Sequence, residues 1–115
     1  MIELGKMVMF SLCVLRNLII FKVVIVSFKH KGLEKFYSSG VSKGIQQKHK
    51  KRLRLMLGIL DTATVVDDID LPGFRLHQLS GQRKETWSVT VNGNWRLTFK
   101  YENGNVHILN YEDYH

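Results

Sequence analysis

The chain has 115 residues, which is enough for one hydrophobic core and excludes a multidomain enzyme. With 44% hydrophobic residues, 23% charged residues and one proline, its composition is that of a folded globular domain. Seventeen Lys and Arg residues against ten Asp and Glu residues give a net charge of +7, which favours polyanionic partners. The single Cys13 excludes an intramolecular disulfide and a cysteine-based metal site, and it indicates a reducing compartment.

The positive charge is concentrated in one segment. Lys29 to Arg54 contains nine basic residues and the single acid Glu34. We therefore expect the polyanion-binding surface to include this segment. Charge alone does not distinguish RNA, DNA and anionic lipid as the partner.

The first 22 residues are hydrophobic, but Glu3, Lys6, Arg16 and Lys22 interrupt them. No run of about 18 apolar residues exists, so a transmembrane helix is not expected. A secretory signal is not expected either, because no small-residue cleavage motif follows the apolar stretch. These observations predict a cytoplasmic protein with no membrane partner.

One strand and two helices are predicted next. Val23 to Phe28 is a β-branched and aromatic run typical of a buried strand. Apolar residues at the spacing i, i+3 and i+4 within His30 to Gly40 predict a short amphipathic helix. A second amphipathic helix is predicted from about Ile45 to Leu60, with basic residues on its flanks and back.

The rest of the chain is predicted to be antiparallel strand. Pro72 and Gly73 mark a loop, and four blocks of alternating or continuous apolar residues follow it. The blocks are Phe74 to Leu79, Thr86 to Val91, Trp95 to Tyr101 and Val106 to Tyr111. Asn-Gly pairs at 92–93 and 103–104 predict tight hairpin turns. The expected fold is α+β, with the helices packed on one face of a mostly antiparallel sheet of four to five strands.

Motifs for nucleotide hydrolysis, zinc proteolysis and ester hydrolysis are absent from the sequence. Instead, an acid, a phenol and an imidazole end the chain, at Asp113, Tyr114 and His115. His77 and Arg96 lie within other strands of the same predicted sheet, so a polar cluster on one sheet face becomes a candidate site. The alternatives are a polar terminus that serves solubility, a buried structural histidine and a surface strand cation.

Three further histidines, His30, His49 and His107, are interpreted as structural, because no nucleophile or orienting carboxylate lies near them in sequence. The basic residues of the second helix are interpreted as an RNA-binding or ribosome-binding surface, since their number exceeds what solubility requires. They are Lys48, Lys50, Lys51, Arg52 and Arg54.

Four motifs resemble the HigB toxins of the RelE/ParE superfamily: SFKHKGLEKFY, RLHQLSG, WSVTVNGNWRLTF and the terminal ILNYEDYH. The resemblance covers about Val24 to His115 and implies a RelE-like fold. It also implies a ribosome-dependent mRNA endonuclease that acts on the 70S ribosome without a metal or other cofactor. A helix-turn-helix antitoxin of the HigA type would neutralise it, and DNA would be contacted only through that antitoxin.

The resemblance also implies roles for individual residues. It places the family's central histidine at His77, its strand arginine at Arg96 and its terminal Asp-Tyr-His at residues 113–115. In this chemistry the ribose 2′-hydroxyl attacks the adjacent phosphate, so a base, a cation and an acid are needed. Some HigB toxins have a lysine three residues after the central histidine, where this chain has Ser80. Arg83 and Lys84 are candidates to supply that cation and to contact RNA.

The hydrophobic segment 1–23 precedes the point at which the family normally begins. One hypothesis is that translation starts at position 24, where a valine codon is read as methionine, so that this segment is not native. Two other functions stay open. One is a non-catalytic toxin that acts on DNA gyrase, as ParE toxins do, and the other is a small toxin that acts on membranes through the segment 1–23.

Overall fold

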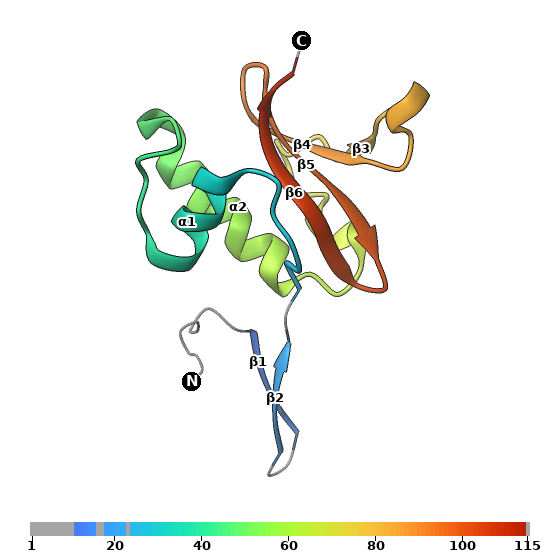
Figure 1. Ribbon diagram of the computed structural model, residues 1–115. Coiled ribbons are helices and arrows are strands. Elements are labelled where there is room, and N and C mark those ends of the chain that lie inside the picture. The colour runs from blue at the N-terminus through green and yellow to red at the C-terminus, as the bar shows by residue number, and fades with distance from the viewer. Residues whose placement is uncertain (1–10, 16–17, 23, 115) are drawn as a thin grey trace.

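A computed structural model describes the backbone of residues 11–15, 18–22 and 24–114, and the side chains of residues 24–114. Two helices, α1 (Lys31–Ser39) and α2 (Lys50–Thr62), lie on one side of a four-stranded antiparallel sheet (Figure 1). Its strands are β3 (His77–Gln78), β4 (Trp87–Asn92), β5 (Trp95–Glu102) and β6 (Asn105–Asp113), in the order β3-β4-β5-β6. The predicted α+β architecture is confirmed.

Helix α1 begins and ends where its capping residues require. His30 has an extended backbone, and its Nδ1 accepts a hydrogen bond from the backbone N–H of Leu33 at 2.9 Å. Gly40 ends the helix in the left-handed conformation, with φ at 79°. Leu33 and Phe36 are buried, so the apolar face predicted from the sequence packs into the core.

Helix α2 begins later than predicted. Gln46 has an extended backbone, and a single 3-10 turn, η2 (Gln47–His49), precedes Lys50. Ile45 is buried in the core, but it belongs to the connecting loop. The four buried residues of α2 have the predicted helical spacing and face the sheet; they are Leu53, Met56, Leu57 and Leu60.

The loop between the two helices packs against the start of α1, where Gly44 of the loop contacts Gly32 of the helix. A Cβ atom at Gly32 would lie 2.7 Å from the carbonyl oxygen of Gly44, closer than non-bonded atoms tolerate. The two backbones therefore pack directly on each other, which only glycine permits.

The predicted strand from Phe74 to Leu79 is wrong in its length, because only His77 and Gln78 form β3. Arg75 has φ at 54°, a left-handed conformation that interrupts an extended strand. The predicted turn at Asn103-Gly104 is confirmed, since both residues have positive φ between Glu102 and Asn105. The first turn is one residue later than predicted: Asn92 ends β4 and pairs with Trp95, and the turn residues are Gly93, with positive φ, and Asn94.

The predicted first strand forms only two isolated bridges. Ile25 pairs with Val106 and Phe28 pairs with Leu109, so this segment lies parallel to β6. A bulge in β6 prevents a continuous ladder: Ile108 has φ at 55°, and its N–H donates to the hydroxyl of Ser27 at 2.8 Å. Val23, the first residue of the prediction, lies outside the described residues.

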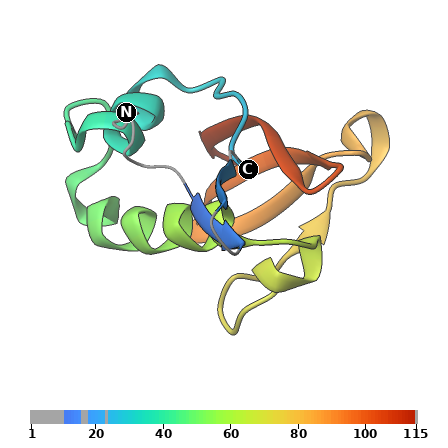
Figure 2. The same ribbon diagram turned by 90° about the horizontal axis from the view of Figure 1, so that it is seen from below.

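The segment before this domain forms a hairpin that was not predicted. Strand β1 (Ser11–Leu15) pairs with β2 (Leu18–Lys22) in a separate two-stranded sheet. The view from below shows the helices on one side of the main sheet and the loop around residue 82 on the other (Figure 2). Within the part of the chain that the structure describes, no helix is long and apolar enough to cross a membrane.

Candidate active site

The candidate site lies on the sheet face that points away from α1 and α2. Directly paired residues of antiparallel strands project to the same face. One such row crosses the sheet through His77, Ser88, Thr98 and Asn110, and the next crosses it through Thr90, Arg96 and Glu112. The alternate residues, Val89, Leu97 and Tyr111, are buried in the core on the helix side. The sheet therefore brings His77 and Arg96 to the same face.

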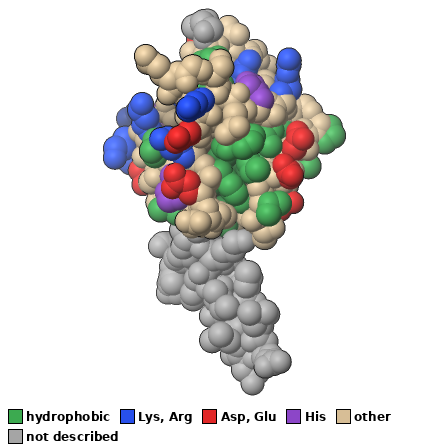
Figure 3. Space-filling view, turned by 90° about the vertical axis from the view of Figure 1, so that its right-hand side faces the viewer, with side chains coloured by type: hydrophobic (Ala, Val, Ile, Leu, Met, Phe, Trp, Pro, Cys, Tyr) green, Lys and Arg blue, Asp and Glu red, His purple; other side chains and the backbone are tan. Residues whose placement is uncertain are grey.

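Figure 3 shows the molecule from the side of this face. Basic side chains and a histidine lie in its upper part, above a hydrophobic patch; acidic side chains lie along the right edge, and basic, acidic and histidine side chains mix on the left. A basic surface of this kind beside apolar groups suits a polyanion that carries bases.

His77 is exposed on β3, so the alternative of a buried structural histidine is wrong. Its Nδ1 lies 2.8 Å from the carbonyl oxygen of Arg75. A carbonyl only accepts hydrogen bonds, so Nδ1 carries the proton and Nε2 is the basic nitrogen of the neutral ring. The left-handed turn at Arg75 directs its carbonyl to the ring, and the ring is thereby held in one tautomer.

Arg96 lies on β5, two strands from His77, and is half-buried. Its Nη1 donates to the carbonyl oxygens of Gly93, at 2.6 Å, and Trp95, at 3.1 Å. These bonds use Nη1 alone and fix the guanidinium at the β4–β5 turn, whereas Nε and Nη2 bond to no residue in the described part of the chain.

The end of the chain lies beside the same turn. Asp113 is paired with Trp95 at the end of β6, and the backbone N–H of Tyr114 donates to the carbonyl oxygen of Asn94 at 2.8 Å. Tyr114 is 38% exposed. Arg96, Asp113 and Tyr114 are therefore at one end of the sheet. Asp113, as the partner of Trp95, projects by strand alternation to the helix-side face, opposite to Arg96, and His115 lies outside the described residues.

Glu112 is the centre of a cluster of hydrogen bonds on this face. Its carboxylate accepts two hydrogen bonds from Arg83, at 2.8 and 3.1 Å, one from the hydroxyl of Thr98 and one from the amide of Asn110 at 3.3 Å. The Arg83 guanidinium lowers the pKa of this carboxyl, and the hydroxyl and amide donors lower it further. The sequence pointed to Arg83 but not to this cluster. Once the strand register is known, Thr98 and Asn110 are direct partners on the same face and the cluster can be recognised.

Arg52 differs from the other cations of α2 because it is part of the fold. Its Nε and Nη2 donate to three carbonyl oxygens, those of Gly73, Thr90 and Val91, each at 3.1 Å. Its guanidinium carbon lies 5.0 Å from the centre of the Phe74 ring. These contacts join α2 to β4 and to the loop before β3.

The lysines at the start of α2 have a different environment. Lys48 and Lys51 are exposed and Lys50 is half-buried, and the first turn of the helix contains no acidic residue. Positive charge at a helix N-terminus opposes the helix dipole and costs roughly 0.3–1 kcal/mol per charge. This arrangement reduces stability and leaves a concentrated positive surface.

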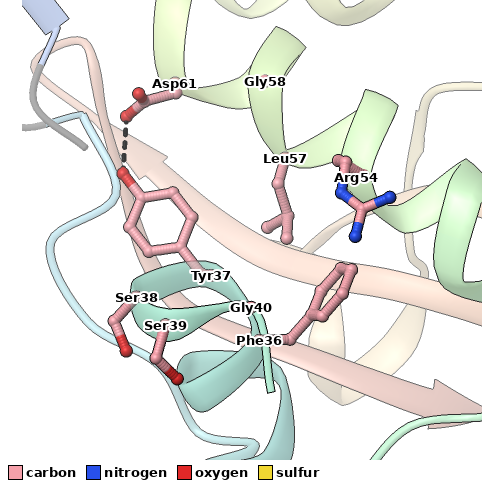
Figure 4. A pocket seen from close by; sticks show the side chains of 9 residues that line it. All are labelled: Phe36, Tyr37, Ser38, Ser39, Gly40, Arg54, Leu57, Gly58 and Asp61. Atoms are coloured by element: carbon pink, nitrogen blue, oxygen red, sulfur yellow. Dashed lines mark hydrogen bonds between the residues drawn. The ribbon is translucent and has the colours of Figure 1, made fainter. Parts of the chain in front are cut away.

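A cavity of about 570 Å³ lies between α1 and α2 (Figure 4). The Arg54 guanidinium carbon lies 5.3 Å from the centre of the Phe36 ring, and the hydroxyl of Tyr37 donates to Asp61 at 2.9 Å. None of the predicted catalytic residues lines this cavity, so it is separate from the candidate active site.

His30 and His49 are structural, as predicted. His30 caps α1 and His49 is buried beside Tyr111, and burial lowers the pKa of both imidazoles. Among the residues that the structure describes, no three His, Cys, Asp or Glu side chains are grouped closely enough to hold a metal ion.

Comparison with known proteins agrees with this geometry. Residues 26–115 match the family model of the RelE-like toxin of the type II toxin–antitoxin system HigB. The chain is also 45% identical to the endoribonuclease HigB of Proteus vulgaris over 92 residues, which is 80% of this chain and the whole of that protein. The chain therefore belongs to the HigB-like toxins of type II toxin–antitoxin systems.

Proposed function

We propose that this protein is an endoribonuclease that cleaves mRNA on the 70S ribosome. The observation that carries the proposal is the shared sheet face of His77 and Arg96, with Tyr114 at the end of the same sheet. The curated relative is named an endoribonuclease, which supports the same reaction class. That name gives no support to a gyrase-directed activity.

The proposed reaction is attack of a ribose 2′-hydroxyl on the adjacent phosphorus. The hydroxyl loses its proton to a base, the bond from phosphorus to the 5′-oxygen breaks, and an acid protonates that oxygen. The products are a 2′,3′-cyclic phosphate and a free 5′-hydroxyl. The three groups that can exchange protons are His77, Asp113 and His115, and Nε2 of His77 is the atom that the Arg75 contact leaves basic.

Arg96 is proposed to bind the scissile phosphate. Adjacent strands lie about 4.8 Å apart and residues rise about 3.4 Å along a strand, so the backbones of His77 and Arg96 are roughly 12 Å apart. The Arg96 guanidinium is held at the β4–β5 turn, so binding of one phosphodiester by both residues would draw it from its contacts with Gly93 and Trp95 towards His77. The planar guanidinium suits the bidentate geometry of phosphate oxygens.

The exposed basic residues are proposed to bind ribosomal RNA or mRNA backbone. This surface comprises Lys48, Lys50, Lys51, Arg54 and Lys84. Arg52 is left out because its donors are used within the fold. A ribosomal target places the protein in the cytoplasm, and membership of a toxin–antitoxin family implies an antitoxin, which we propose is of the HigA type.

The experiment combines purified protein with ribosomes that are programmed with a defined reporter mRNA, and maps the cleavage sites by primer extension. We expect cleavage of the translated mRNA, a 5′-hydroxyl at each cut end, and no cleavage by His115→Gln. Equal cleavage of free mRNA would contradict ribosome dependence. Inhibition of DNA supercoiling by gyrase, with intact mRNA, would support the gyrase function instead.

A further inference from the structure

An ion pair joins the loop after β3 to the last strand of the sheet. Arg83 ends the 3-10 turn η4 (Gly81–Arg83), and its two terminal nitrogens donate to the two carboxylate oxygens of Glu112 on β6. This bidentate geometry fixes the orientation of the guanidinium plane as well as its position.

The hydrogen bonds of Glu112 make it a poor candidate for proton transfer. Besides the two bonds from Arg83, its Oε2 accepts from Thr98 and Asn110. A carboxylate with four donors around it is held ionised and is a poor proton acceptor. Thr98 and Asn110 hold this carboxylate in place, and the carboxylate in turn binds both terminal nitrogens of Arg83. These contacts indicate that Glu112 orients Arg83.

Arg83 in turn contacts Tyr114. Its guanidinium carbon lies 5.9 Å from the centre of the Tyr114 ring, within the range of a cation–π contact. The backbone of Tyr114 is held separately by the carbonyl oxygen of Asn94. The loop after β3 thus contacts the ring of Tyr114, and the β4–β5 turn holds its backbone.

We infer that Arg83 is a positioning residue: oriented by Glu112, it supports the Tyr114 ring at the end of β6, and it does not bind the RNA phosphates. This inference rests on the proposed function. It revises the interpretation of Arg83 as the replacement for the family lysine, because the charge of Arg83 is neutralised by Glu112. Binding of the flanking RNA phosphates then falls to Lys84, Arg54 and the lysines at and just before the start of α2, while Arg96 keeps its proposed role at the scissile phosphate.

The kinetic test measures single-turnover cleavage against ribosome concentration for Arg83→Gln, Glu112→Gln and their double variant. A positioning role predicts that each single variant lowers the maximal rate by about 10- to 100-fold. It also predicts an unchanged half-saturating ribosome concentration and an unchanged salt slope. The double variant should lose no more than either single variant, because both break one linkage.

Three matched variants accompany these measurements. Lys84→Gln should raise the half-saturating concentration and reduce the salt slope by about one unit without lowering the maximal rate. Glu85→Gln, which removes an exposed charge beside Arg83, should leave both parameters unchanged. Arg83→Lys keeps the charge but loses the bidentate contact, and should fall well below wild type in maximal rate. If Arg83→Gln behaves like Lys84→Gln, or Arg83→Lys like wild type, the inference is wrong.

A second measurement does not depend on activity. The ring resonances of Tyr114, followed by NMR in the full chain, should shift in Arg83→Gln and in Glu112→Gln and stay in place in Glu85→Gln. Unchanged Tyr114 resonances in both would overturn the inference. If wild-type protein cleaves no ribosome-bound mRNA while these shifts occur, the proposed function fails but the structural linkage stands.

Discussion

The hydroxyl of Tyr111 on β6 lies within hydrogen-bond distance of Nδ1 of His49, which is buried at the start of α2. The same hydroxyl accepts a hydrogen bond from the backbone N–H of Gln46 at 3.4 Å, so it links the turn before α2 to β6. Burial of the imidazole disfavours its charged form. Its Nε2 is buried and has no hydrogen-bond partner among the described residues.

This relationship predicts acid sensitivity of the fold. Burial, aided by the Lys48 charge, lowers the pKa of His49 below its unfolded value near 6.5, so the unfolded state binds the proton more readily. The contribution to stability is complete above pH 6.5 and is lost as pH falls from 6.5 through the folded pKa. Thermal melts from pH 8 to pH 5 should show this decrease in Tm for wild type.

The control for acid sensitivity is His49→Gln, which has no titrating ring. It should be less stable than wild type at pH 8, and its Tm should change less between pH 7 and pH 5. His30 also has a lowered pKa, so His30→Asn, which preserves an N-cap side chain, separates the two contributions. An equal fall in Tm for wild type and His49→Gln would show that His49 does not cause the sensitivity.

Replacement of His77 by alanine is expected to affect catalysis without affecting the fold. The side chain is exposed and packs against no core residue, so the free energy of unfolding should change by no more than about 0.5 kcal/mol. Loss of a proton-transfer group should lower the cleavage rate by about 100-fold or more. Single-turnover cleavage and thermal melting of His77→Ala test both statements, and a wild-type rate would remove His77 from the site.

Local signals in the sequence predicted both helices and the two hairpins of the main sheet, but not the β1–β2 hairpin. The turns use positive φ at Gly93 and at Asn103-Gly104, and the 3.6-residue period of α2 depends on residues close in sequence. The length of β3 was mispredicted because the alternating apolar pattern does not reveal the left-handed conformation at Arg75, which interrupts the strand. Similarly, the bulge at Ile108 breaks the predicted first strand through a contact with Ser27, which is distant in sequence.

The candidate site was predictable only in part, because residue types suggest chemistry but long-range packing decides which donors stay available. Arg52 and Lys51 are adjacent and both basic, yet Arg52 bonds to three carbonyl oxygens whose position depends on how α2 packs against β4. The sequence alone indicates that Arg83 is a free cation, whereas in the folded chain it binds Glu112, which is distant in sequence. The proposed catalytic roles of the remaining residues stay predictions.

Arg96 is expected to stabilise charge that develops on the phosphate during cleavage. Arg96→Ala should raise the barrier by roughly 3 kcal/mol, as loss of an oxyanion donor does, and Arg96→Lys should lie between it and wild type. Both variants also lose contacts with the carbonyl oxygens of Gly93 and Trp95, which is worth about 1 kcal/mol of stability. Cleavage rates measured well below each variant's Tm separate the two effects. An unaltered rate for Arg96→Ala would exclude phosphate binding by this residue.

The adjacent residues Lys51 and Arg52 should respond in opposite directions to removal of their charge. Lys51→Glu replaces a cation with an anion in the first turn of α2, where the helix dipole favours negative charge. It should raise the free energy of unfolding by about 0.5–1 kcal/mol while weakening association with the ribosome in a salt-dependent way. Urea denaturation and ribosome binding at two salt concentrations measure these changes.

Arg52→Ala should lower the free energy of unfolding, because it removes the donors to three carbonyl oxygens and the contact with Phe74. Hydrogen bonds from a charged donor are worth about 1.5–3 kcal/mol each, but the freed carbonyls regain water, so we expect a net loss of about 2–4 kcal/mol. Cleavage at saturating ribosome concentration, measured below the variant's Tm, should be retained. A stable Arg52→Ala protein with weakened ribosome binding would return Arg52 to the RNA-binding surface and show that its contacts with β4 contribute little to the fold.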